Sequence, residues 1–232
     1  MEGRTSSEGR VVRIPGFVIR AYRPQDLRHV QRIFAEGLVD MVGPAFKRAV
    51  LAPFNVTLLL AAFGAGYTLT GSLPWAGLAS LALLALVYLS CWVLYTRYVR
   101  EILRGDMGDI ESCYVRAPGC GFWVAEEEGR EGRLAGMVAA KAQPPLACEL
   151  LRLSVDRTYR RRGLAQGLTE VVLDFARGLG CAVCHLSTSN AQQPALRLYQ
   201  RLGFRVVGTE LPHLGPLTRL SQILTCKLER AL

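Results

Sequence analysis

The chain has 232 residues, of which half are hydrophobic and 20% are charged, and its formal net charge is +9. This length is typical of one ordinary domain with an additional segment, not of two large domains. The positive charge indicates a nucleic acid, an anionic membrane surface or an anionic ligand as partner. Because the sequence has no nucleic-acid-binding motif, we expect no nucleic acid and favour a membrane surface together with a phosphate-bearing ligand.

Residues 1–16 lack the apolar core of a secretory signal, and we expect them to form a disordered tail. Residues 17–48 begin with a strand from Phe17 and continue into a helix that Asp26 would cap. The apolar side chains of this helix recur at helical spacing, so one of its faces is apolar.

Residues 49–96 contain no Asp, Glu, Lys, Arg or His. A helix needs about 20 residues to cross the hydrocarbon core of a bilayer, and this stretch is about twice as long. The turn signal GSLP at 71–74 divides it into two helices, expected near 50–70 and 75–96. The short connection makes the pair a hairpin, so both of its ends emerge on the same side.

Basic residues flank this hairpin, with Lys47 and Arg48 before it and Arg97, Arg100 and Arg104 after it. Since cytosolic flanks carry an excess of Lys and Arg, we predict a transmembrane hairpin whose ends lie in the cytosol. Two alternatives stay open. The pair is a buried helical hairpin inside a soluble fold, or it is a wedge that enters only one leaflet.

Residues 97–232 alternate between strand and helix patterns. Strands are expected at 121–128, 133–142, 147–156, 182–188 and 204–209 and within 217–228, and helices at 107–115, after 163 and near 194. Hairpins and crossovers are mixed, which predicts an α/β fold with a mixed sheet, in the broad α+β sense.

Cysteine and histidine do not indicate a metal. The seven cysteines and three histidines are scattered along the chain. Cys181 and Cys184 form a Cys-x-x-Cys pair, but the sequence CAVCHLS around them is typical of a buried strand. We therefore expect reduced thiols and no bound metal.

The sequence SVDRTYRRRGLAQGL contains the most informative turn. A strand ends at 156, a basic turn follows, and Gly163, Leu164 and Ala165 open an amphipathic helix. Such a turn directs backbone N–H groups and the positive end of the helix dipole to one place, which suits a pyrophosphate. Gly163 allows close approach to the backbone, and the side chains of residues 160–162, which are Arg160, Arg161 and Arg162, add positive charge. The alternative is a solvated cationic loop.

A second feature is ALRLYQRLGF at 195–204, a helix followed directly by a glycine and a strand. Tyr199 lies in the middle of this helix. Taken alone, such a tyrosine is typical of a core aromatic with a satisfied hydroxyl.

Together these two features resemble the GNAT family of N-acetyltransferases. The family's pyrophosphate motif Q/R-x-x-G-x-G/A is matched by Arg160, Gly163 and Ala165, and its motif L-Y-x-x-x-G-F is matched by residues 198–204. Gln192 departs from the family, which often has Asn there, so a binding role for Gln192 does not carry over. The resemblance implies the GNAT fold, with acetyl-CoA as co-substrate and no metal.

The apolar hairpin between the first and second helices, followed by GDMGDIESCYV and GCGFWVAE, resembles the camello group of this family. That group includes enzymes that acetylate aspartate and enzymes that acetylate cysteine S-conjugates. The resemblance implies a protein of the endoplasmic reticulum membrane, with the catalytic residues 97–232 facing the cytosol. It favours an aspartate-like amine acceptor, with a cysteine S-conjugate next.

The resemblance also implies roles for single residues. Glu149 is the candidate base for the attacking amine, and His185 is a second candidate. A backbone N–H near Leu153 would hold the oxyanion, while Leu153 and Val155 would pair with the pantetheine arm as an added strand would. Tyr199 would protonate the departing thiolate.

Regular alternation along the strand places Arg152 on the face opposite Glu149, Leu151 and Leu153. From there its guanidinium could grip a substrate carboxylate through two hydrogen bonds. Two other functions stay open: a protein-lysine N-acetyltransferase, and a catalytically idle, membrane-tethered acyl-CoA-binding scaffold. The sequence does not choose the acceptor amine or the oligomeric state.

Overall fold

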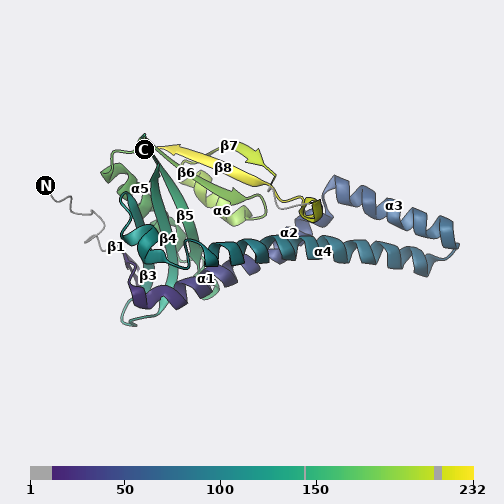
Figure 1. Cartoon of the computed structure of the whole chain (residues 1–232), viewed down its shortest axis with the longest axis horizontal. Coiled ribbons are helices and arrows are strands. Elements are labelled where there is room, and N and C mark those ends of the chain that lie inside the picture. Colours follow the sequence, from purple (N-terminus) through teal and green to yellow (C-terminus); the bar gives the residue numbers. More distant parts are fainter. Residues whose placement is uncertain (1–11, 144, 212–215) are drawn as a thin grey trace.

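A computed structural model describes residues 12–143, 145–211 and 216–232 as a mixed sheet covered by helices, with a helical hairpin projecting from it (Figure 1). The strands are β1 (Val12–Ile14), β2 (Phe17–Ala21), β3 (Cys120–Glu127), β4 (Leu134–Gln143), β5 (Ala147–Val155), β6 (Val183–Ser189), β7 (Arg205–Glu210) and β8 (Thr225–Ala231). The helices are α1 (Leu27–Val39), α2 (Val42–Val50), α3 (Pro53–Thr70), α4 (Leu73–Arg104), α5 (Leu164–Gly178) and α6 (Gln193–Arg201). Short helical turns are η1 (Pro24–Asp26), η2 (Glu111–Val115), η3 (Arg157–Tyr159) and η4 (Pro216–Ser221).

The described strands form one sheet in the order β1-β2-β3-β4-β5-β6-β8-β7. All neighbours are antiparallel except β5 and β6, which are parallel and are joined by α5. A parallel pair needs a crossover connection, and α5 supplies it. The fold is therefore the mixed α/β arrangement expected from the alternating pattern.

Each face of the sheet has its own apolar core. On one face α5 buries Leu164, Leu168 and Val172, whose spacing forms a single helical stripe. On the other face α1 buries Ile33 and Phe34 together with residues of η2. Because both faces of the central strands are covered, these strands can only be approached where they separate or end, whereas β7 is exposed along most of its length.

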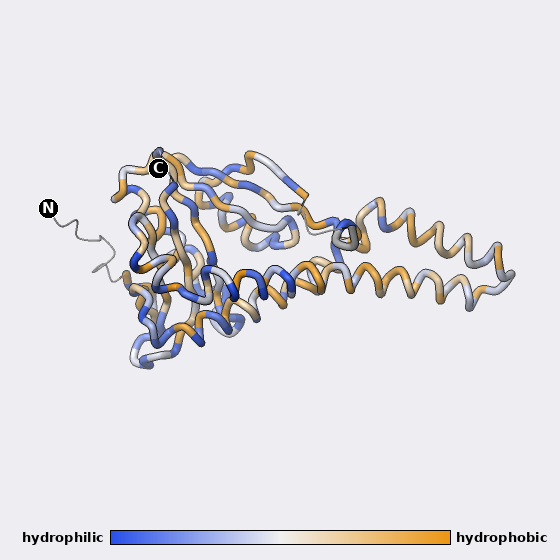
Figure 2. Tube along the Cα trace, viewed as in Figure 1, coloured by the Kyte–Doolittle hydropathy of each residue, from blue (hydrophilic) through white to orange (hydrophobic). Residues whose placement is uncertain are grey.

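Helices α3 and α4 extend beyond the sheet, and most of the residues in the projecting part are hydrophobic (Figure 2). Within the described residues, α4 is the one helix that is by itself long and apolar enough to cross a membrane. Only 22% of its most apolar window is buried in the protein, so it is not an ordinary core helix. The segment Pro53–Thr70 qualifies only in combination with Pro24–Val50, from which it is bent by 67°.

The base of the hairpin is attached to the body of the protein. Asn55 of α3 is buried, and its amide nitrogen donates to the carbonyl oxygens of Ala49 and Leu220, both at 2.8 Å. Along α4, Cys91 and Leu94 are buried in a third apolar cluster that includes residues of the body. The part of the hairpin nearest the sheet is thus packed into the globular fold.

The structure differs from the expectations at three element boundaries. Strand β1 pairs with β2 and lies inside the segment 1–16 that was expected to be a tail, because Ile14 packs against α5 at Gly167. Helix α4 continues past residue 96 to Arg104, since its last turns pack on the body. The last strand begins at Thr225. Residues 1–11 lie outside the described residues.

Candidate active site

The turn between β5 and α5 presents free hydrogen-bond donors. Gly163 is the N-cap of α5 with φ +80°, and a Cβ at this position would meet no atom within 4 Å. The amides of residues 164–166 have no carbonyl partner inside the helix, and none is found for them elsewhere in the described part of the chain. Leu164 contributes only its backbone, because its side chain is buried. These unpaired amides lie at the positive end of α5, an arrangement that suits an anion.

Asp156 shapes the first half of this turn. Its carboxylate accepts hydrogen bonds from the backbone N–H of Thr158, at 3.0 Å, and from the Thr158 hydroxyl, at 2.7 Å. These bonds satisfy the donors of η3 and close the strand end into a compact loop. The loop then delivers the basic residues 160–162 directly in front of α5.

The three arginines of the turn are not equivalent. Arg160 donates from Nε to the carbonyl oxygen of Val155, at 3.2 Å, and its guanidinium lies 3.1 Å from the Asp40 carboxylate. The guanidinium of Arg162 lies over the ring of Tyr159, 5.4 Å from the ring centroid. Arg161 is exposed and adopts a left-handed φ of +65°, which an arginine tolerates only at a cost. All three side chains are exposed and can contribute positive potential.

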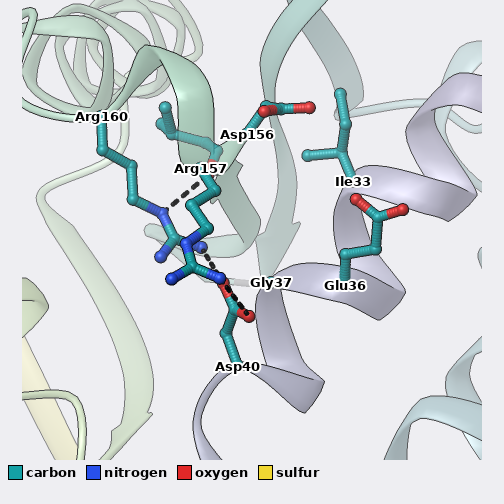
Figure 3. A pocket seen from close by; sticks show the side chains of 8 residues that line it. Ile33, Glu36, Gly37, Asp40, Asp156, Arg157 and Arg160 are labelled. Atoms are coloured by element: carbon teal, nitrogen blue, oxygen red, sulfur yellow. Dashed lines mark hydrogen bonds and ion pairs between the residues drawn. The ribbon is translucent and has the colours of Figure 1, made fainter.

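A cavity of about 240 Å³ lies between the end of α1 and this turn (Figure 3). Its lining residues come from both sides: Ile33, Glu36, Gly37, Asp40, Val155, Asp156, Arg157 and Arg160. Asp40 attracts Arg160 and, at 3.9 Å, Arg157, so ion pairs connect α1 to the turn. Sequence reasoning missed Asp40, and no local pattern could have paired it with arginines so distant in the chain.

Strand β5 contains a bulge at Arg152. Met137 of β4 lies opposite Ser154, and Ala139 lies opposite Leu151, so two residues of β5 occupy the space opposite one residue of β4. Arg152 has φ +56°, an uncommon value for a residue other than glycine. Leu151 packs on the α1 side of the sheet and Leu153 on the α5 side. The expected alternation is therefore wrong at this point: Arg152 contacts the α1 side, on the same face as Leu151, because the bulge resets the alternation.

Strands β5 and β6 separate immediately before the bulge. Their parallel pairing ends at Leu150 opposite Leu186, while β6 continues to pair with β8 as far as Ser189. From residue 151 to Val155, the side of β5 that faces β6 has no strand partner among the described residues. An open strand edge of this kind accepts an extended ligand through main-chain hydrogen bonds.

Tyr199 lies on α6 in the same apolar cluster as Leu153, Val155 and Leu164. Its ring packs edge-on against Phe204, with centroids 5.7 Å apart. Burial, and to a lesser degree the neighbouring Cys184, raises the pKa of the Tyr199 phenol above its ordinary value. Its hydroxyl makes no hydrogen bond within the described part of the chain, in contrast to the satisfied hydroxyl of an ordinary core tyrosine.

Comparison with known proteins decides the family. The model of the Acetyltransferase (GNAT) family matches residues 88–204, which include the turn, the separated strands and Tyr199. The chain belongs to the GNAT family of acetyltransferases. A solved acetyltransferase of this family from Staphylococcus aureus Mu50 superposes with a TM-score of 0.53 over 93% of this chain and 99% of that one, at 16% identity.

Relatives of known name indicate which group this acetyltransferase modifies. Human N-acetyltransferase 8B is 35% identical over 84% of this chain and 87% of its own length, and mouse N-acetyltransferase family 8 member 3 is 37% identical over 82% and 85%. Rat N-acetylaspartate synthetase is 34% identical over 89% of this chain and 69% of its own length. This GNAT protein is therefore an acetyl-CoA-dependent N-acetyltransferase.

The two candidate bases of this acetyltransferase lie next to each other. Glu149 of β5 is directly opposite His185 of β6, one residue before the strands separate. The Glu149 carboxylate accepts a hydrogen bond from the side-chain amide of Gln143 at 2.7 Å. Both candidates are half-buried, so the arrangement alone does not choose between them.

Arg152 is held in a polar cluster that sequence reasoning did not anticipate. Its Nε and Nη2 donate to the two carboxylate oxygens of Asp106, both at 3.0 Å, and its Nη1 donates to the Tyr98 hydroxyl at 3.1 Å. Asp106 also accepts a hydrogen bond from Tyr114. Since a guanidinium has five N–H groups, two donors of Arg152 are left over. They belong to Nη1 and Nη2 and can bind one further anion.

No part of the described structure provides a metal site for this acetyltransferase. No group of three or more His, Cys, Asp or Glu residues that could hold an ion occurs among the described residues. Cys184 lies opposite Cys148 on the neighbouring strand, and both are free and buried. Burial raises the pKa of each of these thiols to about 12, so they stay protonated near neutral pH.

Proposed function

We propose that the protein is a membrane-anchored N-acetyltransferase that acetylates the primary amine of a small amino acid carrying a carboxylate. An aspartate-like acceptor is favoured, and a cysteine S-conjugate is next. The observation that carries the proposal is the geometry at the β5 bulge. There, the open edge of β5 begins beside Arg152, whose guanidinium lies over the Phe34 ring of α1 and has two N–H groups that make no bond within the described residues.

The β5–α5 turn fits the pyrophosphate of acetyl-CoA. The free amides of 164–166 would donate to it, Gly163 would allow it to reach the backbone, and Arg160, Arg161 and Arg162 would balance its charge. Ala165 is half-buried, and its small side chain would obstruct the approach to these amides little. The open edge of β5 at Leu153 and Val155 would then pair with the pantetheine arm.

Four steps complete the reaction. Glu149, directly or through a water molecule, takes a proton from the acceptor ammonium, and the neutral amine attacks the thioester carbon. A backbone N–H near Leu153 stabilises the oxyanion of the tetrahedral intermediate. The C–S bond breaks as the carbonyl re-forms. Tyr199 donates its proton to the departing thiolate, a role that fits a phenol whose hydroxyl has no other partner. The second proton, which the attacking nitrogen loses as the amide forms, returns to the Tyr199 phenolate through water.

Arg152 selects the acceptor in this proposal. A carboxylate can accept two parallel hydrogen bonds from the free ends of Nη1 and Nη2, a geometry that a lysine ammonium cannot reproduce. The rat relative is named N-acetylaspartate synthetase, and aspartate has two carboxylates. The side-chain amine of a lysine within a protein has no carboxylate of its own, which disfavours the protein-lysine alternative.

The hairpin would anchor this enzyme in the membrane of the endoplasmic reticulum, with the sheet in the cytosol. Helix α3 has 18 residues, a rise of about 27 Å, close to the thickness of the hydrocarbon core. A Cβ on Gly66 would lie 2.9 Å from Ala76 Cα, so the two helices approach closely through small residues, as membrane helices do. Trp75 is exposed near the tip, where a far interface would lie.

The test is an acceptor panel with thiol detection of released CoA, using the full chain in lipid nanodiscs. The acceptors are aspartate, an S-substituted cysteine and a lysine-containing peptide. CoA release with aspartate, lost in Arg152→Gln, is expected. Release with the peptide alone would make the protein a lysine acetyltransferase. Acetyl-CoA binding without release for any acceptor would support the idle scaffold. In a separate experiment on cell membranes without nanodiscs, recovery of the full chain in the supernatant after ultracentrifugation would contradict the anchor.

A further inference from the structure

The membrane helix α4 makes a hydrogen bond to the end of β6. Tyr95 of α4 is buried, and its hydroxyl lies 3.1 Å from the Ser189 hydroxyl. Ser189 is the last residue of β6 and pairs with Thr225 of β8. Because β6 borders the opening between β5 and β6, this bond connects the anchor to one wall of the candidate active site.

The turn after Ser189 is compact and leads directly into α6. The Asn190 N–H donates to the Leu224 carbonyl oxygen at 2.8 Å, and the Gln192 N–H donates back to the Ser189 carbonyl oxygen at 3.0 Å. The Gln193 side chain donates to the Asn190 carbonyl oxygen at 2.9 Å. The next residues form α6, which carries Tyr199. The turn therefore transmits the position of Ser189 to the helix that holds the candidate acid.

Apolar packing holds the same turn against the anchor. Ala191, which follows Asn190, is 6% exposed and belongs to a cluster with Cys91 and Leu94 of α4. Ile223 of the β7–β8 connection completes the contact. Removing the Tyr95 hydroxyl would leave this packing in place, so the hydrogen bond can be tested separately from the fold.

We propose that Tyr95 is a positioning residue: through Ser189 it fixes the start of α6 and thereby the hydroxyl of Tyr199 beside the reacting thioester. The inference rests on the proposed role of Tyr199 as the acid. Displacements of about 1 Å in a catalytic group are enough to lower rates by large factors. The membrane anchor thus supplies a residue that the catalytic site needs, in addition to its attachment.

The first experiment compares Tyr95→Phe with Tyr88→Phe. Tyr88 lies on the same helix, stacks edge-on against Phe46 and makes no hydroxyl hydrogen bond among the described residues. We expect Tyr95→Phe to lower kcat about tenfold, the effect of a modest displacement. In Tyr95→Phe the KM for acetyl-CoA should stay unchanged, because the β5–α5 turn is not altered. The melting temperature should also stay unchanged, because the apolar packing remains. Tyr88→Phe keeps the wild-type kcat.

The variant Ser189→Ala and its combination with Tyr95→Phe complete a double-mutant cycle, and Ser189→Thr serves as the conservative control. Ser189→Ala is expected to reproduce the loss in kcat, and the double variant with Tyr95→Phe is expected to lose no more than either single variant. Ser189→Thr keeps the hydroxyl and should retain most of the wild-type rate. Additive losses, or a fall in kcat that comes with a raised KM and a lower melting temperature, would overturn the proposal in favour of a merely structural contact.

Hydrogen–deuterium exchange of residues 189–201 provides a readout that does not require turnover. Faster exchange in Tyr95→Phe, with wild-type exchange in Tyr88→Phe, is expected. Wild-type exchange together with wild-type kcat in Tyr95→Phe refutes the inference. If Tyr199→Phe keeps the full kcat, the proposed role of Tyr199 is wrong, and the inference about Tyr95 is wrong with it. If kcat falls in Tyr199→Phe but not in Tyr95→Phe, the proposed function stands and the inference about Tyr95 is refuted.

Discussion

Gly163→Ala is the most direct test of the pyrophosphate turn. Gly163 has φ +80°, and a Cβ there would meet no protein atom within 4 Å. The cost to the folded protein is therefore conformational, about 1–2 kcal/mol for an alanine in the left-handed region. Gly180 is a matched control: its φ is +73°, a Cβ there also meets nothing within 4 Å, and it lies at the opposite end of α5.

The two substitutions should differ only in acetyl-CoA binding. In Gly163→Ala the new methyl group occupies the space in which the pyrophosphate would approach the first amides of α5. Loss of one hydrogen bond to a charged group costs about 1.5–3 kcal/mol, which raises the Kd roughly 10- to 150-fold. Gly180→Ala should leave the Kd unchanged.

Chemical denaturation and calorimetric titration with CoA measure these two quantities on the full chain in detergent. We expect the free energy of unfolding to fall by a similar amount in both variants and the Kd to rise in Gly163→Ala alone. Equal values of Kd in the two variants would refute the placement of the pyrophosphate at this turn, whatever happens to stability.

Three further predictions concern the side chains of the site. Tyr199→Phe should lower kcat about 10²- to 10⁴-fold, as expected for loss of a general acid, with the Kd for CoA unchanged in the same titration; an unaltered kcat would remove Tyr199 from the mechanism. Arg152→Lys should raise the KM for aspartate about tenfold or more, because one point charge replaces a two-pronged donor, while the KM for acetyl-CoA stays constant. The raised pKa of Tyr199 keeps its proton in the folded state, whereas the unfolded chain loses it near pH 10. The free energy of unfolding should therefore be fully retained below pH 10 and fall above it, by up to about 1.4 kcal/mol per pH unit, and denaturation of Tyr199→Phe should show a smaller fall.

Local patterns predicted most of the fold. The basic turn before an apolar helical stripe located Gly163 and α5, and the uncharged stretch with its central turn located the hairpin. Both signals depend on residues close together in the sequence, which is why they could be found there. The family motif containing Tyr199 added the expectation of α6, and the helix lies where that motif placed it.

Contacts between distant segments could not be predicted. The bulge at Arg152 has no sequence signal, since arginine rarely adopts a positive φ, and it reversed the face assigned to that side chain. The carboxylates that hold the two key guanidinium groups, Asp40 for Arg160 and Asp106 for Arg152, come from other helices or their connections. Such ion pairs depend on how elements pack, and neither composition nor periodicity contains that information.

The pairing of β2 with β3 has a consequence for how the protein is made. Arg20 lies opposite Val124 in the finished sheet, although the whole apolar hairpin separates these strands in the chain. With the hairpin as the proposed membrane anchor, β2 and α1 would emerge first during synthesis and would wait while the hairpin enters the lipid, and only the returning chain would bring β3 alongside. We therefore expect insertion into the bilayer to precede closure of the sheet, so that a chain whose hairpin fails to insert leaves the edge of β2 exposed to aggregation and proteolysis.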